Sequence, residues 1–369
     1  MKTQKIKEGK VEFYAPLGNK YETPVFYNPE GTLTRNISIS SIQNFQKDFK
    51  KKITICDALA GTGIAGLRYA KELTGVKKVF LVDKNPLAVN LIKKNIKLNK
   101  LSKKCSVEKE DANIILRKRV FNVIDLDPFG SPNIFIDSTA RSIYHKGFLA
   151  ITATDQAPLC GTYPLKCLKK YGIKSIKTEF YNELGIRILI SFIILSLSRY
   201  GRAFVPVLSL CSKHYYRIFG KIEHQGKISK LIKEFRYLNY CPKCGERTLG
   251  FIEKYHKFGN KKHKFENCGL IYLGKINDAK FCKKVLKDLK KRDFKTEEKL
   301  IEQIMQEANM PPFYYDIHRL AKRLKKKIPK TEVLMKKLKN RGFKASRTHF
   351  SPVSIKTDAK MRDLRVILR

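Results

Sequence analysis

The segment DLDPFG, residues 125–130, combines two acids, a proline and an aromatic residue at the end of an apolar run. A carboxylate at Asp127 and the backbone carbonyl of Pro128, whose ring stiffens the turn, can each accept one N–H of an exocyclic amine on a nucleic-acid base. These contacts turn the nitrogen lone pair toward a methyl donor, and the negative charge stabilises the cation that forms on nitrogen. Phe129 offers a face on which the base can stack. The segment therefore predicts methyl transfer to an amine; the alternative is that Asp127 only caps the next element.

A glycine-rich segment precedes these residues in the chain. DALAGTGIAG, residues 57–66, has the spacing G-x-G-x-x-G between an apolar run and a helical pattern, where glycines allow a tight turn and a close approach to a nucleotide-like ligand. The spacing alone fits a nicotinamide dinucleotide as well as S-adenosylmethionine (SAM). Asp57, four residues before Gly61, would repel a pyrophosphate but attract the ammonium group of a methionine moiety. With Gly61 and Gly63 at the turn, the segment favours SAM.

Acidic residues stand at the ends of successive apolar runs, although the chain as a whole is basic. They are Asp57, Asp83, Asp111, Asp127 and Asp155. Asp83 is placed to accept both hydroxyls of a ribose. Asp111, followed by Ala112, is placed to meet an adenine amine. The alternative is that these acids are solvated loop residues, but their shared position at strand ends favours a ligand site.

A parallel sheet is needed to bring these residues together. Five apolar runs predict strands, and two amphipathic segments between them predict helices. The strands are 53–57, 79–83, 105–110, 121–127 and 147–154, and the helices are 64–73 and 85–99. Residues 203–217 add one or two strands. Alternating strands and helices form a mostly parallel sheet covered on both faces, with ligands at the carboxyl ends of the strands. The predicted fold class is α/β, with a Rossmann-like sheet of the SAM-dependent methyltransferase kind.

The chain changes character twice after the sheet. Residues 1–236 are predicted to form the methyltransferase domain with an N-terminal extension, 237–275 a small insert around the knuckle CPKCG, and 276–369 a basic C-terminal domain. The last part contains three helical patterns followed by two segments that can pair as a hairpin. They are 296–308, 316–327 and 331–342, which ends at Gly342, and then 343–350 and 351–359. Three helices and a hairpin predict a winged-helix-like α+β domain.

The charge of the chain indicates a polyanionic partner. Lys and Arg number 77 against 33 Asp and Glu, a formal net charge of +44, while the hydrophobic content of 43% is typical of a folded protein. An acidic membrane is the other candidate, but the longest uncharged apolar run, Ile188 to Ser198, is shorter than the roughly 18 residues that span a bilayer. The N-terminal segment lacks the apolar core of a secretory signal, and most of the nine cysteines stand alone in apolar runs. We therefore expect a cytoplasmic protein that binds nucleic acid.

Taken together, the motifs resemble those of the archaeal and eukaryotic tRNA (guanine(26)-N2)-dimethyltransferases over nearly the whole chain. They are VFYNP (25–29), TRNIS (34–38), DALAGTGIAGLR (57–68), DLDPFGSP (125–132), TATDQAPLCGTYP (152–164), ELGIRILI (183–190) and GLIYLG (269–274). The resemblance implies SAM-dependent transfer of one or two methyl groups to N2 of guanine 26 in tRNA. It implies that Asp127 is the catalytic acid and that SAM is contacted by Arg35, Arg68, Asp83, Asp111 and Ala112. For the two arginines, the methionine carboxylate is the expected partner.

The knuckle departs from the pattern of this family. Its members often carry two Cys-x-x-Cys pairs, the spacing of a four-cysteine zinc site. Here Cys241 and Cys244 form an intact first pair, and the second is replaced by YHKFGNKKHKFENC, residues 255–268. The candidates for the two missing zinc ligands are His256, His263 and Cys268, of which we expect His263 and Cys268. The alternative is a knuckle held by packing without a metal.

Basic runs are concentrated in the C-terminal part and interleaved with aromatic residues. The runs are 290–292, 323–327, 336–337 and 339–341, and the aromatic residues are Phe313, Tyr314, Tyr315 and Phe343. This pattern is typical of a surface that follows phosphates. We expect it to hold a tRNA together with the basic rim of the sheet domain, with base 26 displaced from its stack and held by Phe129, Tyr163 or Phe180. No membrane and no obligate protein partner is expected, and the charge favours a monomer.

Three other functions would use part of the same pattern. A nicotinamide-dependent oxidoreductase would use the glycine loop but leaves DLDPFG and the charge unexplained. A methyltransferase that acts on another RNA or DNA amine would need the same acids. A non-catalytic RNA-binding protein on a methyltransferase scaffold would keep the basic surface but would not need acids at the strand ends.

Overall fold

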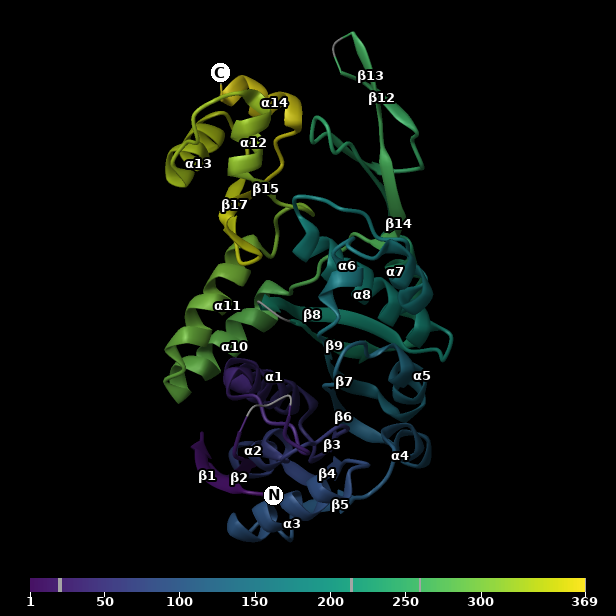
Figure 1. Cartoon of the computed structure of the whole chain (residues 1–369), viewed down its shortest axis with the longest axis vertical. Coiled ribbons are helices and arrows are strands. Elements are labelled where there is room, and N and C mark those ends of the chain that lie inside the picture. Colours follow the sequence, from purple (N-terminus) through teal and green to yellow (C-terminus); the bar gives the residue numbers. More distant parts are fainter. Residues whose placement is uncertain (19–21, 213–214, 259, 369) are drawn as a thin grey trace.

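The computed structural model describes residues 1–18, 22–212, 215–258 and 260–368. Its centre is a seven-stranded sheet with the order β5-β4-β3-β6-β7-β9-β8 (Figure 1). The strands in this order are Cys105–Glu108, Val76–Val82, Ile53–Asp57, Phe121–Leu126, Ile143–Ala153, Tyr215–Glu223 and Ala203–Ser212. The five from β5 to β7 are parallel, β9 is antiparallel to β7, and β8 is antiparallel to β9. The predicted parallel sheet is confirmed, and segment 203–217 is the beginning of an antiparallel pair that extends to Glu223.

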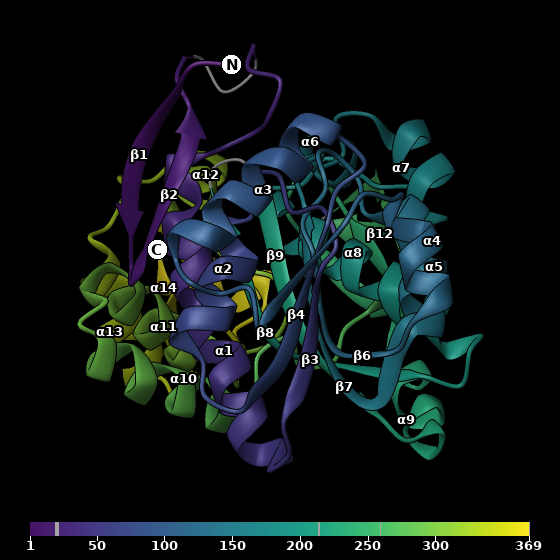
Figure 2. The same cartoon turned by 90° about the horizontal axis from the view of Figure 1, so that it is seen from below.

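Helices cover both faces of this sheet because residues on each strand alternate between the two sides. Ile55 belongs to one buried cluster and Cys56 to the other. Figure 2 shows one set of helices on each side of the strands. One face carries α1 (Thr32–Phe49), α2 (Ile64–Glu72), α3 (Pro86–Leu98), α10 (Ala279–Arg292) and α11 (Lys295–Glu307), and the other carries α4 (Ala112–Lys118), α5 (Asn133–Ser142) and α8 (Tyr181–Ser198). Both predicted helices, α2 and α3, are confirmed.

Helix α8 is the one described helix that is long and apolar enough to cross a membrane by length and composition. Most of it is buried inside the protein, against the sheet. Its apolar character is therefore accounted for by its place in the core.

The remaining elements before residue 235 lie around the sheet. An N-terminal hairpin is formed by β1 (Thr3–Glu8) and β2 (Val11–Pro16). Short helical segments complete the loops: η1 (Pro29–Gly31), α6 (Gln156–Leu159), α7 (Pro164–Tyr171), η2 (Gln225–Lys227) and α9 (Ile228–Ile232).

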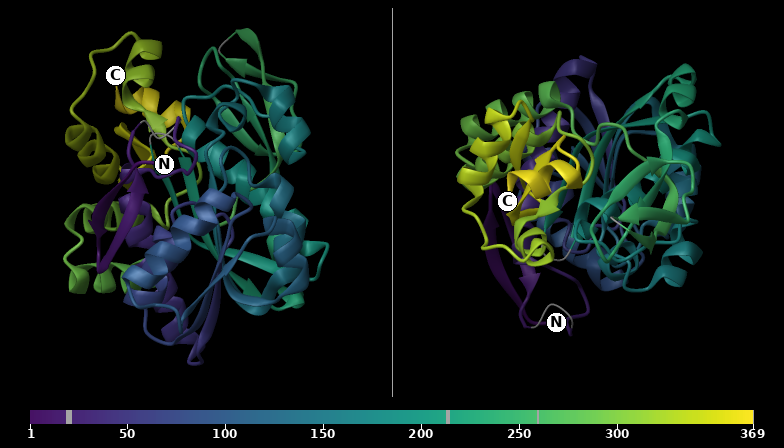
Figure 3. Two further views of the ribbon diagram at one scale, coloured as in Figure 1. Left: turned by 60° about the horizontal axis from the view of Figure 1, so that its bottom comes forward. Right: turned by 90° about the horizontal axis from the view of Figure 1, so that it is seen from above.

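The knuckle segment forms a small sheet with a projecting hairpin. The sheet has the order β11-β10-β14, and β12 pairs only with β13. These strands are Arg247–Gly250, Phe235–Tyr240 and Glu266–Tyr272 in the sheet, and Tyr255–Phe258 and Lys261–Lys264 in the hairpin. The hairpin stands at the end of the molecule that also carries the last helices of the chain (Figures 1 and 3).

The C-terminal part contains the three predicted helices and the predicted hairpin. After α11 come β15 (Tyr315–Asp316), α12 (Ile317–Leu324), α13 (Thr331–Asn340), β16 (Ala345–Thr348), β17 (Ser351–Thr357) and α14 (Met361–Ile367). Gly342 has φ +83°, as expected of a residue that ends a helix in the left-handed region. A separate small core includes Leu320, Leu338 and Ile355. By contrast, α10 and α11 share the buried cluster of α1 and the sheet, so these two helices are packed as part of the larger body.

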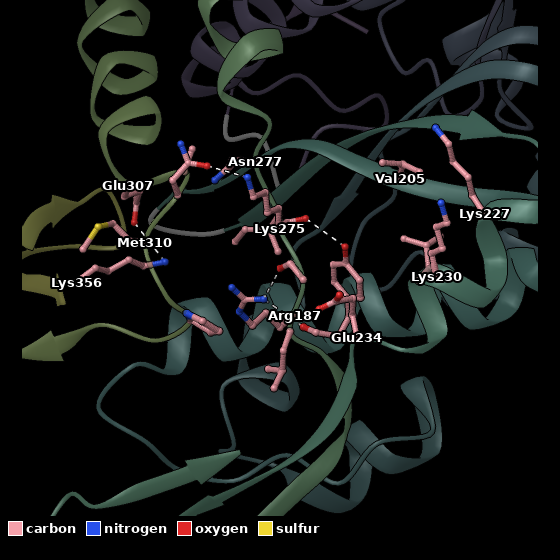
Figure 4. A pocket seen from close by; sticks show the side chains of 18 residues that line it. Arg187, Val205, Lys227, Lys230, Glu234, Lys275, Asn277, Glu307, Met310 and Lys356 are labelled. Atoms are coloured by element: carbon pink, nitrogen blue, oxygen red, sulfur yellow. Dashed lines mark hydrogen bonds and ion pairs between the residues drawn. The ribbon is translucent and has the colours of Figure 1, made fainter. Parts of the chain in front are cut away.

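Buried ion pairs join the last strands to the sheet domain. Lys356 on β17 lies 3.0 Å from Oε1 of Glu183 on α8 and 3.6 Å from Oε2 of Glu307 on α11. Glu183 also binds Arg187, and Glu307 binds His349. A cavity of about 530 Å³ lies beside this network (Figure 4). Because its buried charges are paired with one another, the network fixes how the two parts meet.

Candidate active site

A second cavity, of about 590 Å³, opens at the carboxyl ends of β3 and β6. After β3 the chain forms β4 and β5 on one side of β3, and it then returns to form β6 and β7 on the other side. The connections that follow β3 and β6 therefore lead in opposite directions, which leaves a crevice between the carboxyl ends of these two strands. Ligands of open α/β sheets bind at such a switch point. Asp57, Asp83, Asp125 and Asp127 all line the cavity, as does Gly61. The structure therefore brings together the acids that end β3, β4 and β6.

The glycine loop forms the floor of this cavity between β3 and α2. Gly61 has φ +54°, and a Cβ atom there would lie 3.0 Å from the carbonyl oxygen of Phe26, so only glycine fits without strain. The N–H of Gly61 donates to Oδ2 of Asp83 (2.9 Å), and the N–H of Asn85 donates to Oδ1 (2.8 Å). Each oxygen keeps a lone pair free of the backbone. Asp83 is thereby held rigidly where two hydroxyls of a ribose could reach it.

Asp57 is buried at the end of β3 and also lines the cavity. Burial and the nearby charge of Asp125 raise the pKa of Asp57 to about 8, although the N–H of Gly66 donates to its Oδ2 (2.9 Å) and opposes the shift. An incoming cation would lower this pKa and favour the carboxylate. The site is therefore suited to an ammonium group and would disfavour an anion.

Of the two arginines implied by the resemblance, only Arg35 lines the cavity. Its Nε and Nη2 each lie 2.7 Å from an oxygen of Glu8 on the N-terminal hairpin, which leaves Nη1 as the group able to bind a ligand carboxylate. Arg68 is fully buried behind it, with Nη1 2.8 Å from Oε1 of Glu8 and Nε 2.7 Å from Oε1 of Glu72. Arg68 thus holds Glu8, which in turn holds Arg35.

Asp111 and Ala112 lie at the start of α4, after β5. Oδ1 of Asp111 accepts the N–H of Asn113 at 2.8 Å, which caps the helix, and Ala112 is buried. Neither residue is among those that line the cavity. Gly63, which begins α2 as its cap at φ +81°, is also outside the lining. The structure therefore does not place these three residues in the cavity lining.

Asp127 directly follows β6 with its side chain accessible from the cavity. The hydroxyl of Thr152 hydrogen-bonds to it. The surrounding protein raises the pKa of Asp127 through burial, the charge of Asp125 adds to the rise, and Arg217 and Thr152 oppose it. Arg217 is buried and donates from Nη1 to Thr152 Oγ1 (2.8 Å) and from Nη2 to Asp125 Oδ2 (2.9 Å). A chain of contacts thus leads from Arg217 through Thr152 to Asp127.

Two aromatic rings stand beside this acid. Pro128 and Phe129 line the cavity, and the Phe129 ring is 67% exposed. Phe26 meets it edge to face, with 4.2 Å between ring centroids. Phe180 is fully buried between Tyr240 and Phe313, and Tyr163 is outside the lining. Among the three aromatic residues considered from the sequence, only Phe129 is placed to meet a base in the cavity.

Several polar residues of the cavity did not stand out in the sequence. Ser38, Thr152 and Arg217 line it, and Nη2 of Arg217 donates to the Ser38 hydroxyl at 2.9 Å. Thr34 and Tyr215 form a further hydrogen bond at the wall. A charged residue inside the apolar run YYRIFG, residues 215–220, is the one signal that could have singled out Arg217.

The knuckle gathers a second set of residues capable of binding a metal. The ligand atoms of Cys241, Cys244, His256 and His263 all lie within 4.8 Å of one another. Sγ of Cys241 is 3.7 Å from Nδ1 of His263, and Sγ of Cys244 is 3.4 Å from Nε2 of His256. Such spacings fit a tetrahedral zinc ion with bonds of about 2.0–2.3 Å. The structure places Cys268 elsewhere, buried on β14 opposite Leu238 in the large core cluster.

The cavity has the groups that SAM requires. Asp57 offers a partner for the ammonium, Arg35 a partner for the carboxylate and Asp83 a partner for the ribose. The volume falls within the roughly 300–1,000 Å³ typical of cofactor pockets. The residues present therefore fit the cofactor.

Comparisons with known proteins cover the whole of this architecture. A family model described as N2,N2-dimethylguanosine tRNA methyltransferase matches residues 4–369. The chain is 39% identical over 379 residues to the tRNA (guanine(26)-N(2))-dimethyltransferase of Methanosphaera stadtmanae, covering 100% of this chain and 97% of that protein. It is 38% identical to the enzyme of the same description from Methanococcus maripaludis, covering 98% and 97%. The solved structure of Trm1 from Pyrococcus horikoshii in complex with S-adenosyl-L-methionine is similar with a TM-score of 0.88 and 32% identity, covering 99% of this chain and 100% of that one.

Proposed function

The chain belongs to the N2,N2-dimethylguanosine tRNA methyltransferase family, and we propose that its cavity transfers one or two methyl groups from SAM to the exocyclic N2 of guanine at position 26 of tRNA. The observation that carries this proposal is that Asp127 and Pro128, which follow β6, line the same cavity as Asp83, the acid after β4 that we propose binds the ribose. A methyl donor and an amine could meet there.

The residues proposed to hold SAM divide into two groups. Asp57, Asp83, Arg35 and Gly61 line the cavity and would contact the cofactor directly. Gly63, Arg68, Asp111 and Ala112 do not line the cavity and would act indirectly, by holding the loop, Glu8 and the start of α4 in place. When bound, SAM supplies the methyl group as a sulfonium and leaves as a neutral thioether.

Asp127 is proposed as the catalytic acid. Its carboxylate would accept one N–H of the guanine amine and the carbonyl of Pro128 would accept the other, so that the nitrogen lone pair faces the methyl donor. As the new bond forms, positive charge develops on nitrogen, and the anionic side chain stabilises it. The same carboxylate can then take the proton that the methylated amine releases. The once-methylated amine keeps one N–H for the second transfer.

Phe129 and Phe26 are proposed to hold the base. Guanine 26 must leave its stack to enter the cavity, which costs a few kcal/mol. A ring face exposed beside Asp127 returns roughly 1–3 kcal/mol through stacking. Because Phe26 packs edge-on against Phe129, it would hold that ring in place beside the base.

We propose that three consecutive parts of the chain have different roles. Residues 1–236 carry the methyl-transfer site, 237–275 form the knuckle and 276–369 supply most of the tRNA-binding surface. Helices α10 and α11 lie within residues 276–369, but they pack against residues 1–236. They would therefore connect the tRNA-binding surface to the part of the chain that carries the methyl-transfer site. A net charge of +44 opposes self-association and favours a monomer, and we expect the enzyme to act in the cytoplasm on tRNA.

At the knuckle we propose one zinc ion held by Cys241, Cys244, His256 and His263. The cysteine turn connects β10 and β11, and the two histidines lie on β12 and β13, so the ion would tie the projecting hairpin to the small sheet. Its role would be structural, since all four positions are filled by protein.

The deciding experiment is to incubate unmodified tRNA with the protein and SAM and to locate the methylated nucleotide by mass spectrometry. Methylation at N2 of guanine 26 is expected. Methylation of a different base would assign the enzyme to another substrate, and the absence of any methyl incorporation would contradict the proposal.

A further inference from the structure

The β12–β13 hairpin projects from the small sheet at the end of the molecule that carries α12 and α14 (Figures 1 and 3). It pairs with no other strand of the described chain. An isolated two-stranded hairpin is only marginally stable by itself. Contacts with the rest of the protein must therefore stabilise this one, and its exposed side chains are free for another role.

The pairing register divides the hairpin into two faces. Tyr255 lies opposite Lys264, and Lys257 lies opposite Lys262. The intervening pairs, His256 with His263 and Phe258 with Lys261, point to the other face because side chains alternate along a strand. We call the face with Tyr255, Lys257, Lys262 and Lys264 the lysine face.

The other face anchors the hairpin to the protein. His256 stacks on Phe265 with 4.5 Å between ring centroids, and Phe258 stacks on His263 at 5.1 Å. The guanidinium of Arg365 on α14 lies 4.0 Å from the centroid of Phe258. With the two cysteines next to the two histidines, these contacts hold the hairpin in one orientation.

The lysine face carries uncompensated charge. Its three lysines are exposed, and none forms an ion pair with a described residue. Like charges directly opposite each other on antiparallel strands, such as Lys257 and Lys262, destabilise the pair. Lys262 lies 4.4 Å from the centroid of the Tyr255 ring, which is itself exposed. A rigid element that repels itself is expected to have its counter-charge on a partner.

We propose that the lysine face is a tRNA-binding arm that contacts phosphates of the RNA backbone away from the base that is methylated. The inference rests on the proposed function for the identity of the RNA. Three ammonium groups and an exposed ring on one face match the repeated negative charge of an RNA strand. Of the nearby acids, Glu253 already accepts hydrogen bonds from Asn239 and Thr248, and Glu266 forms no ion pair with a described residue. Phosphate contacts position an RNA without reading its sequence.

The test compares two charge-matched triple variants of the full chain. Lys257→Gln/Lys262→Gln/Lys264→Gln removes the lysine face. The control, Lys51→Gln/Lys52→Gln/Lys77→Gln, removes three exposed lysines before and at the beginning of β3 and β4, the edge of the sheet opposite the cavity. Binding of unmodified tRNA is measured over a series of KCl concentrations, together with SAM affinity and thermal unfolding.

The arm variant is expected to bind tRNA roughly tenfold or more weakly at physiological salt, with a slope of log Kd against log salt that is about two units shallower. Its SAM affinity should equal that of the wild type, and its melting temperature should be no lower, because the repulsion between Lys257 and Lys262 is removed. The control should keep most of the wild-type slope. If both variants lose the same affinity, or if the arm variant keeps the wild-type slope, the arm does not bind RNA.

Reversal of one charge on the lysine face distinguishes an effect on tRNA binding from an effect on the stability of the hairpin. Lys257→Glu places an opposite charge across from Lys262, which should stabilise the hairpin, yet it should weaken tRNA binding. Tighter or unchanged binding would overturn the proposal. Wild-type protein that binds tRNA but methylates no guanine would count against the proposed function alone, since the arm is judged by binding and not by turnover.

Discussion

Arg217 bridges both carboxylate oxygens of Asp125 inside the sheet, with Nη1 2.8 Å from Oδ1 and Nη2 2.9 Å from Oδ2. Both residues are buried, and Tyr69 donates a further hydrogen bond to Oδ2. Because Asp125 stands two residues before Asp127, the same guanidinium acts on the second acid through Thr152. The guanidinium of Arg217 therefore neutralises the carboxylate of Asp125, while the carboxylate of Asp127 stays accessible from the cavity.

The first prediction concerns Asp127 itself. Asp127→Asn keeps the shape of the side chain but removes its negative charge and its ability to take a proton. Methyl transfer to tRNA should fall by roughly 10²–10⁴-fold. SAM affinity, measured by titration calorimetry, should stay within a few-fold of the wild type, because the groups proposed to bind the cofactor are untouched. Wild-type turnover by this variant would remove Asp127 as the catalytic acid.

The second prediction concerns Thr152. Burial raises the pKa of Asp127, and the hydrogen bond from Thr152 is one of the contacts that hold the rise down. Thr152→Val removes that bond, so the pKa should rise further. Since the ionised carboxylate is the active form, the acid limb of the plot of kcat against pH should move to higher pH.

Thr152→Ser is the matched control for this change, because it keeps a hydroxyl at the same position. Its pH profile should follow the wild type. Arg35, Asp57, Asp83 and Tyr215 also border the cavity and remain in both variants. A profile for Thr152→Val that drops in height without moving along the pH axis would indicate that Thr152 only packs against its neighbours.

Those site residues could be predicted from the sequence whose type is unusual at their position. Asp57, Asp83 and Asp127 end strands in a chain rich in lysine, and the structure brings all three to one cavity. Arg217 was not recognised in the same way, since its place inside the apolar run YYRIFG is a weak signal in a chain with 77 Lys and Arg, and its burial is known only from the structure. Local pattern therefore identified the acids, while their partner came from the antiparallel strand β9, far along the chain.

The limits of the fold prediction have a similar cause. Strands at 53–57 and 121–127 were recognised because each is buried on both faces and reads as a continuous apolar run. The helix at Ala279–Arg292 was not recognised, because its lysines hide a narrow apolar stripe that includes Phe281, Val285 and Leu289. The sequence favoured Cys268 over His256 as a zinc ligand. Spacing along the chain does not reveal that a hairpin brings His256 next to His263 and the two cysteines.

The third prediction addresses the C-terminal surface. Deletion of residues 276–369 would expose the core shared by α10, α11 and α1, so point changes are the better test. Lys325→Gln/Lys326→Gln/Lys327→Gln alters an exposed basic run at the end of α12. We expect weaker tRNA binding and a shallower salt dependence in filter-binding assays, with SAM affinity unchanged. Salt-insensitive binding by the wild type would contradict the prediction that this basic surface holds tRNA through charge.

The fourth prediction distinguishes the two possible ligand sets at the knuckle. Metal analysis of the purified protein should find about one zinc ion per chain. Cys241→Ser and His256→Ala should lose the metal and lower the melting temperature, whereas Cys268→Ala should retain it. Loss of zinc from Cys268→Ala with retention in His256→Ala would instead support the ligands that the sequence alone favoured.

The fifth prediction concerns Glu307, which joins the C-terminal part to the rest. Burial would raise its pKa, but the charges of His349 and Lys356 outweigh burial and hold the pKa at about 2. A carboxyl whose pKa is lower in the folded protein than its ordinary value of about 4.3 stabilises the fold above that value. The stabilisation should disappear as the pH falls from about 4 to about 2.

Glu307→Gln should therefore lower the free energy of unfolding by about 3 kcal/mol at neutral pH, and the difference from the wild type should shrink below pH 4. Urea unfolding followed by circular dichroism measures it, since the chain has no tryptophan. Glu332→Gln, which alters an exposed pair with Arg347, serves as the control and should change little. A deficit for Glu307→Gln that persists undiminished at pH 2 would show that packing around residue 307, and not its charge, stabilises the junction.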